Sequence, residues 1–147
     1  MKTVRPDAPQ RPPTQQQLTL KFPAGILGFD QAREFVLHPA PPDSFYLWLE
    51  IASQPGRGFI VISPSNCAPA YAPDISQPDC DFLGITSPDD AFVLTIVTIN
   101  PNGAATVNLR SPLVINRHTL KGKQCVPANV STFKLQHPLE QRPAAAA

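Results

Sequence analysis

The sequence lacks the long apolar runs that membrane proteins need. No stretch approaches the roughly 18 residues of a membrane-spanning helix, and no apolar segment follows the basic residues of the first 17 positions. A secretory signal peptide requires such a segment. We therefore expect a cytosolic protein that has no membrane partner.

Cysteine is also scarce. The three cysteines are widely spaced, and none forms a Cys-x-x-Cys pair: Cys67, Cys80 and Cys125. An odd, scattered set argues against a disulfide framework, and the missing ligand spacing argues against a zinc site. The sequence therefore predicts neither a metal nor another cofactor.

Signatures of catalysis are missing too. There is no Gly-x-Ser-x-Gly, no His-Glu-x-x-His and no glycine-rich phosphate or dinucleotide loop. The three histidines are scattered along the chain: His38, His118 and His137. Cys67 lies alone in a proline-rich loop, and Asp89-Asp90 follows Ser87-Pro88, which favours a solvated turn. Without a nucleophile near a base, paired carboxylates or a metal, we expect a protein that is not an enzyme.

Charged residues are few and segregated. They make up 16% of the chain, and the net charge of +1 gives no overall attraction to nucleic acid or anionic lipid. Positions 74–90 contain five aspartates and no Lys or Arg, whereas positions 91–139 contain five basic residues and no acid. These stretches are either two ordinary solvated surfaces or include an acidic face for a basic protein partner.

What the chain does contain is proline and short apolar segments. Nineteen prolines oppose long helices, and a hydrophobic fraction of 42% is enough to bury a core. Strand signals follow one another along the chain: 18–22, 34–38, 45–51, 58–63, 91–99, 105–110, 113–116, 123–126 and 133–135. Residues 91–99 are apolar on both faces, so we expect them to form the central strand.

One short helix is predicted. Ser76 and Asp79 have the spacing of a capping box and precede Phe82 and Leu83, of which we expect Phe82 to be buried. Many short strands and one helix predict a mostly β fold, a small antiparallel β-barrel-like domain spanning 17–139. Residues 1–16, rich in Pro and Gln, and 140–147, with four terminal alanines, are predicted to be disordered tails.

A series of motifs resembles a known family. In order along the chain these are FPAGILGF at 22–29, FYLWL at 45–49, YAPDI at 71–75, ATVNL at 105–109 followed by Ser-Pro, INRHTLKGKQ at 115–124, and His-Pro-Leu at 137–139. Each is weak alone, but the ordered set covers about 18–139. On these motifs the chain resembles the FliW family of flagellar assembly factors.

The resemblance implies a compact β-barrel-like fold and two protein partners, flagellin and the translational regulator CsrA. Family members antagonise CsrA and so relieve its repression of flagellin translation, until flagellin captures the factor in a partner exchange. CsrA binds RNA and should therefore carry basic surface, which favours the acidic stretch as its contact: Asp74, Asp79 and Asp81. Further candidates for partner binding are Asn108, Asn116, Arg117, Lys121 and Gln124. The alternative role of the two asparagines and Gln124 is to pin turns by side-chain hydrogen bonds.

The second functional hypothesis is a small β-barrel module that binds RNA directly. It would use the basic residues that follow the central strand: Arg110, Arg117, Lys121 and Lys123. Such modules stack bases on aromatic side chains beside a basic groove. No aromatic residue lies between Phe92 and Phe133, so the sequence argues against direct nucleic-acid binding.

Overall fold

The computed structural model describes residues 16–139. The predicted tails, 1–16 and 140–147, lie outside this range except for Gln16. The described elements, in chain order, are β1 Leu18–Lys21, β2 Glu34–His38, β3 Tyr46–Ile51, β4 Gly58–Ile62, the 3-10 turn η1 Pro64–Asn66, α1 Gln77–Leu83, η2 Pro88–Asp90, β5 Ala91–Ile99, β6 Ala105–Val107, β7 Leu113–Asn116, β8 Gly122–Gln124, η3 Val130–Thr132 and β9 His137–Pro138.

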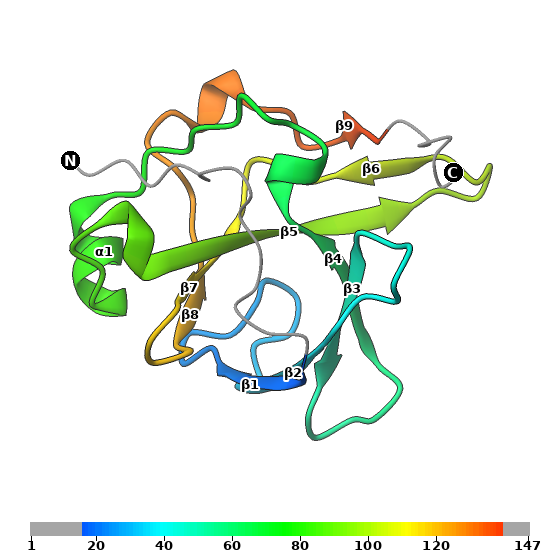
Figure 1. Ribbon diagram of the computed structural model, residues 1–147. Helices are drawn as coiled ribbons and strands as arrows, with labels where there is room; N and C mark the ends of the chain where they lie inside the picture. Colours follow the sequence, from blue (N-terminus) through cyan, green and yellow to red (C-terminus); the bar gives the residue numbers. More distant parts are fainter. Residues whose placement is uncertain (1–15, 140–147) are drawn as a thin grey trace.

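The strands form one antiparallel sheet organised by β5 (Figure 1). Its neighbours run in the order β1-β2-β3-β4-β5-β6-β9. The second half of β5 pairs with β4 and β6, whereas its first half pairs with β7, which in turn pairs with β8. The prediction that 91–99 forms the central strand is confirmed, because β5 is a partner of three other strands.

The sheet curls back on itself without closing. The backbone N–H of Lys21, at the end of β1, donates to the carbonyl of Leu120 at 3.0 Å. A single parallel bridge joins Lys21 to Lys121 in the β7–β8 turn. The predicted mostly β, barrel-like fold with one short helix is therefore confirmed, with an isolated bridge where a closed barrel would have a full strand pair.

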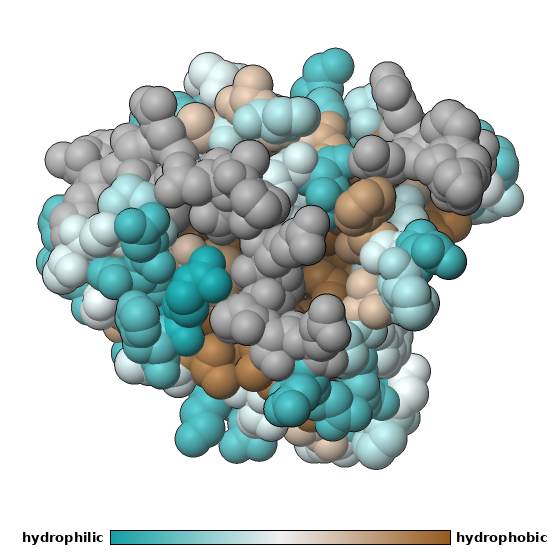
Figure 2. Space-filling model, in the orientation of Figure 1, coloured by the Kyte–Doolittle hydropathy of each residue, from teal (hydrophilic) through white to brown (hydrophobic). Residues whose placement is uncertain are grey.

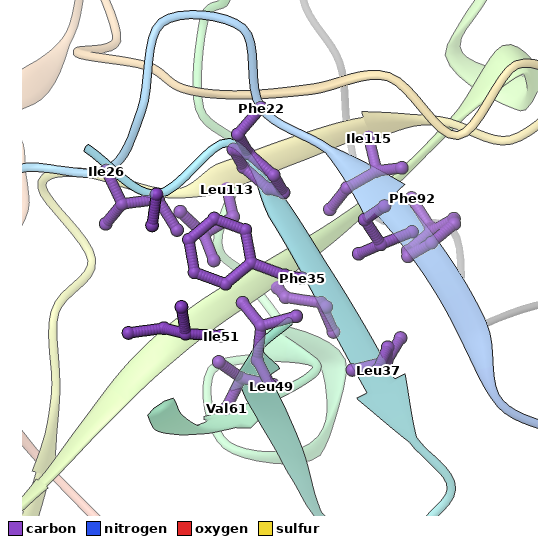
Figure 3. Packing of buried hydrophobic residues seen from close by; sticks show 13 residues of the cluster. Phe22, Ile26, Phe35, Leu37, Leu49, Ile51, Val61, Phe92, Leu113 and Ile115 are labelled. Atoms are coloured by element: carbon purple, nitrogen blue, oxygen red, sulfur yellow. The ribbon is translucent and has the colours of Figure 1, made fainter. Parts of the chain in front are cut away.

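The main core lies inside this curl (Figure 3). Alternation in β2 and β3 turns Phe35, Leu37, Leu49 and Ile51 inward. The ring of Phe22 meets that of Phe35 edge to face, with centroids 5.4 Å apart. The expected alternation of 45–51 is thus confirmed, although the strand begins at Tyr46.

A second apolar cluster holds α1 against the outside of the sheet. It joins Ile75, Cys80 and Leu83 to side chains of β5 and β7, among them Val93 and Val114. Because β5 contributes to this cluster and to the main core, both of its faces are apolar, as a central strand covered on two sides requires.

Three predicted strands differ from the structure by more than one residue at an end. The strand expected at 105–110 ends at Val107, because the Oδ1 atom of Asn108 accepts hydrogen bonds from the N–H groups of Arg110 and Ser111 and turns the chain. The one expected at 123–126 is β8, Gly122–Gln124. A strand at 133–135 is wrong: Phe133 follows η3 and packs its ring on that of Tyr71, and the last strand is β9.

Candidate functional site

Helix α1 forms as predicted and presents a polar outer surface. The Oγ atom of Ser76 accepts a hydrogen bond from the backbone N–H of Asp79 at 3.3 Å, and Gly84 ends the helix in the left-handed conformation with φ of 73°. Cys80 and Leu83, three residues apart, turn toward the sheet. Phe82 lies about 100° away around the helix and is 37% exposed, so the expectation that it is buried is wrong.

The carboxylate of Asp79 is engaged within the protein. Its Oδ1 atom lies 2.9 Å from the Nζ atom of Lys123 in β8, and the two side chains are only 16% and 28% exposed. Asp79 therefore bridges helix and sheet. A reciprocal capping box forms instead between Ser87, the N-cap of η2, and Asp90, its last residue. The acidic stretch is not a uniform row of free charges.

The other two predicted acids differ from Asp79 in exposure. Asp81 is exposed, and its Oδ1 atom accepts a hydrogen bond from Nε2 of Gln77 at 2.7 Å. Asp74 is half-buried, and its backbone N–H donates to Oδ1 of Asn129 at 2.9 Å. Of the three, Asp81 is the one whose charge projects from the helix into solvent.

The β7–β8 hairpin brings basic residues against the same helix. Nζ of Lys121 lies 4.0 Å from the centroid of the Phe82 ring, within cation–π distance. We call the surface formed by Asp79, Asp81, Phe82, Lys121 and Lys123 the α1–hairpin face. It combines an exposed ring with charges of both signs on two elements, which is a chemistry suited to contacting another protein.

Asn116 holds the turn of this hairpin. Its side chain is buried; Nδ2 donates to the carbonyl of Leu83 at 2.8 Å, and Oδ1 accepts from the backbone N–H groups of His118 and Thr119 at 2.8 and 3.1 Å. The residue thereby ties the end of α1 to the hairpin. A direct contact between Asn116 and a partner stays a prediction.

Asp90 supports the same turn from η2. Its Oδ2 atom accepts hydrogen bonds from the N–H and hydroxyl of Thr86 and from the N–H of Ser87, and its Oδ1 atom lies 3.2 Å from Nε2 of His118. The bonds from Thr86, then those from Ser87 and His118, hold the pKa of the Asp90 carboxyl below its usual value. The expected turn at 89–90 is present, and its carboxylate serves the fold.

The remaining candidates lie elsewhere. Oε1 of Gln124 accepts a hydrogen bond from the N–H of Leu27 at 2.8 Å and so fixes the loop between β1 and β2. Asn108 shapes the turn after β6. The structure therefore gathers Asp79, Asp81 and Lys121 on one face and leaves Asn108 and Gln124 outside it. Sequence reasoning missed Phe82 as a surface residue, although its place beside Leu83 in a helix carried that signal.

The basic residues of the RNA hypothesis have protein neighbours. Lys123 pairs with Asp79, and the guanidinium of Arg117 lies 5.6 Å from the ring centroid of Phe92, which is buried. The structure does bring aromatic rings to Arg117 and Lys121, which their sequence separation had concealed. Only Phe82 among these rings is exposed, however, and stacking of successive bases requires a series of exposed rings.

Two of the three cysteine thiols are poorly suited to nucleophilic chemistry. Burial raises the pKa of Cys67 to about 11 and that of Cys125 to about 12, so both remain protonated at neutral pH, whereas the thiolate is the nucleophile. Among residues 16–139, no group of three or more His, Cys, Asp or Glu side chains is placed to hold a metal ion. In that same range, no helix is long and apolar enough to cross a membrane.

Comparison with known proteins places the chain in a family. The model of the FliW protein family matches residues 9–139. The flagellar assembly factor FliW of Leptospira biflexa is 40% identical over 110 residues, covering 73% of this chain and 71% of that protein. The factor of the same name from Bdellovibrio bacteriovorus is 34% identical over 139 residues, covering 89% and 79%.

A solved structure agrees with these relatives. A crystal structure of the flagellar assembly factor FliW superposes with a TM-score of 0.75 at 31% identity, covering 83% of this chain and 85% of that one. The chain therefore belongs to the FliW family of flagellar assembly factors.

Proposed function

We propose that this protein is a flagellar assembly factor that works in the cytosol by binding flagellin and CsrA in turn. While bound to CsrA it relieves repression of flagellin translation, and accumulating flagellin then captures it and frees CsrA. The observation that carries the proposal is the family match, which spans residues 9–139. No bond is made or broken in this exchange.

The α1–hairpin face supports a protein-binding role. Its exposed ring and charged residues lie on elements fixed by the Asp79–Lys123 ion pair and by the hydrogen bond from Asn116 to Leu83. A surface held in place in this way loses little conformational entropy when a partner binds. Asp81 offers the open negative charge that a basic regulator of RNA would meet.

Partner exchange gives a direct test of the proposal. Flagellin titrated into a preformed complex of this protein with fluorescently labelled CsrA is expected to release the CsrA, in buffer containing EDTA as well as without it. The chelator should have no effect because the exchange requires no metal. Fluorescence anisotropy follows the release. Failure of the protein to bind CsrA or flagellin at all, or binding abolished by EDTA, would refute the proposed mechanism.

Replacing Asp81 with Lys tests the contact with CsrA. We expect the association rate to fall about two- to fivefold, because one exposed charge pair contributes about 0.2–1 kcal/mol and acts mainly on encounter. The difference should fade in about 1 M salt, where the Debye length is about 3 Å. Stopped-flow fluorescence at low and high salt measures it.

Asp81 is a cleaner probe than Asp79, because reversing Asp79 would place a second cation against Lys123 and break an ion pair of the fold. The control is Asp30→Lys, which makes the same charge change at an exposed position in the loop after β1. Equal association rates for the Asp81 and Asp30 variants at low salt would show that α1 does not face CsrA.

A further inference from the structure

An apolar groove lies on the opposite part of the molecule from α1. It has a volume of about 560 Å³ and runs between β3 and the β5–β6 hairpin, with Tyr46, Trp48 and Ile60 on one side and Ile99, Ala105 and Leu139 on the other. Tyr46 is 42% and Ile99 58% exposed. Figure 2 shows hydrophobic surface (brown) between the regions of β3 and β6 in the orientation of Figure 1. An apolar hollow of this kind is a candidate surface for docking another segment of chain.

Sheet register places the start of β1 at the same end of the sheet as this groove. Leu18 pairs with Leu37, and His38 pairs with Trp48. Extending the first register by one residue places Gln17 opposite His38, and its Nε2 atom lies 3.2 Å from the Nδ1 atom of that residue. Gln17, His38 and Trp48 therefore share the outer face of three adjacent strands. Because β1 is antiparallel to β2 and β2 to β3, β1 runs parallel to β3, and its first residues lie at the end of the sheet where β3 begins with Tyr46.

The chain before Gln17 is long enough to reach the groove. Adjacent strands lie about 4.8 Å apart, so β1 and β3 are separated by about 10 Å. Four residues in the polyproline II conformation span about 12 Å. Pro13 lies four residues before Gln17, so the proline-rich part of the segment is within reach of Trp48.

The segment also has the right chemistry. Pro6, Pro9 and Pro12 recur every third residue, and polyproline II has three residues per turn, so these rings would form one edge of such a helix. Proteins recognise this conformation in grooves lined by aromatic side chains, since it needs little further ordering to bind. Tyr46 and Trp48 supply the aromatic lining here.

We propose that the groove between β3 and the β5–β6 hairpin binds a polyproline II segment, and that its occupant is residues 5–13 of this same chain. Occupation covers Trp48, which lines the groove. The proposal stands independently of any flagellar partner, because it rests on register, reach and groove composition within one chain.

The single tryptophan of the sequence makes the test specific. In the full-length chain, substitution of Pro6, Pro9 and Pro12 by Ala is expected to shift the emission of Trp48 to longer wavelength and to raise its quenching by acrylamide. Removal of residues 1–13 should do the same. A peptide of residues 1–16, added at about the millimolar effective concentration of a short tether, should restore protection to the truncated chain, whereas the triple-alanine peptide should not.

Removal of residues 140–147 is the matched control, because that segment follows Leu139 of the groove; it is expected to leave the quenching unchanged. Circular dichroism and a thermal melt verify that each variant is folded, and the full-length triple-alanine variant decides the question if the truncated form is not. Unchanged quenching in the triple-alanine variant would overturn the proposal, as would exposure of Trp48 by the C-terminal deletion alone.

Discussion

Replacing Gly122 with Ala is expected to lower the free energy of unfolding by about 1–3 kcal/mol, the usual cost of adding a methyl group to a packed core. A Cβ atom at this position would lie 2.6 Å from Cζ of Phe22. That ring is fully buried and packs against Phe35, so it has little room to move. Urea denaturation followed by circular dichroism measures the loss.

A double-mutant cycle identifies the cause. Phe22→Leu alone should destabilise the protein because it leaves empty volume in the core. In the double variant the alanine methyl group occupies part of that volume, so the combined loss should be smaller than the sum of the two single losses by at least about 0.5 kcal/mol. Additive losses would show that Gly122 is required for a reason other than its contact with Phe22.

The fold could be predicted wherever a short stretch of sequence determines the structure of its own residues. Residues 91–99 are apolar on both faces, and only a strand covered on two sides suits them; β5 is that strand. Ser76 followed by Asp79 set the start of α1 correctly. In both cases the physical cause lies within a few residues of the chain, so the sequence alone is sufficient.

The prediction from sequence is wrong at residues whose structure depends on contacts with distant parts of the chain. Phe133 and Leu135 alternate as the residues of a strand do, but they pair with no neighbouring strand in the described part of the chain and come directly after η3. The ring of Phe133 packs instead on that of Tyr71, about 60 residues away in sequence. Phe82 was expected to be buried because it is apolar, but the helix offers the sheet only the side that carries Cys80 and Leu83. Tertiary packing thus overrides local preference at these positions.

The candidate site likewise has some features that local sequence predicts and others that depend on tertiary packing. The sequence marked Asp79 as a charged residue of the helix, but its pairing with Lys123 depends on how the β7–β8 hairpin packs against α1. Composition cannot distinguish a carboxylate that bridges two elements from one, such as Asp81, that meets solvent. The acidic stretch that the sequence presented as one surface therefore divides into structural and exposed members.

Replacing Asn116 with Ala is expected to lower the free energy of unfolding by about 2–4 kcal/mol, because all hydrogen bonds of the side chain are lost and the carbonyl of Leu83, a buried residue, loses its Nδ2 donor. The melting temperature should fall by about 5–15 °C for a chain of this size. Differential scanning calorimetry measures the change. The matched control is Asn108→Ala, which removes two accepted bonds from a half-buried turn and should cost only about 1 kcal/mol.

Asn116→Asp separates the bond to Leu83 from the two bonds of the turn. The aspartate keeps the acceptor for His118 and Thr119 but, when ionised, has no donor for the Leu83 carbonyl. Burial beside that carbonyl favours the neutral acid, whereas the two N–H donors favour the ion; we expect burial to prevail, so that the pKa of the new carboxyl in the folded state lies above its unfolded value of about 3.9. A group of this kind contributes its full stability below the unfolded pKa and loses it as the pH rises through the folded pKa.

The stability deficit of the variant relative to the native protein should therefore be smaller at about pH 4 than at pH 7. Urea titrations of both proteins at each pH measure this deficit. A deficit independent of pH would mean that the protonated carboxyl does not replace the amide donor of Asn116 to the Leu83 carbonyl.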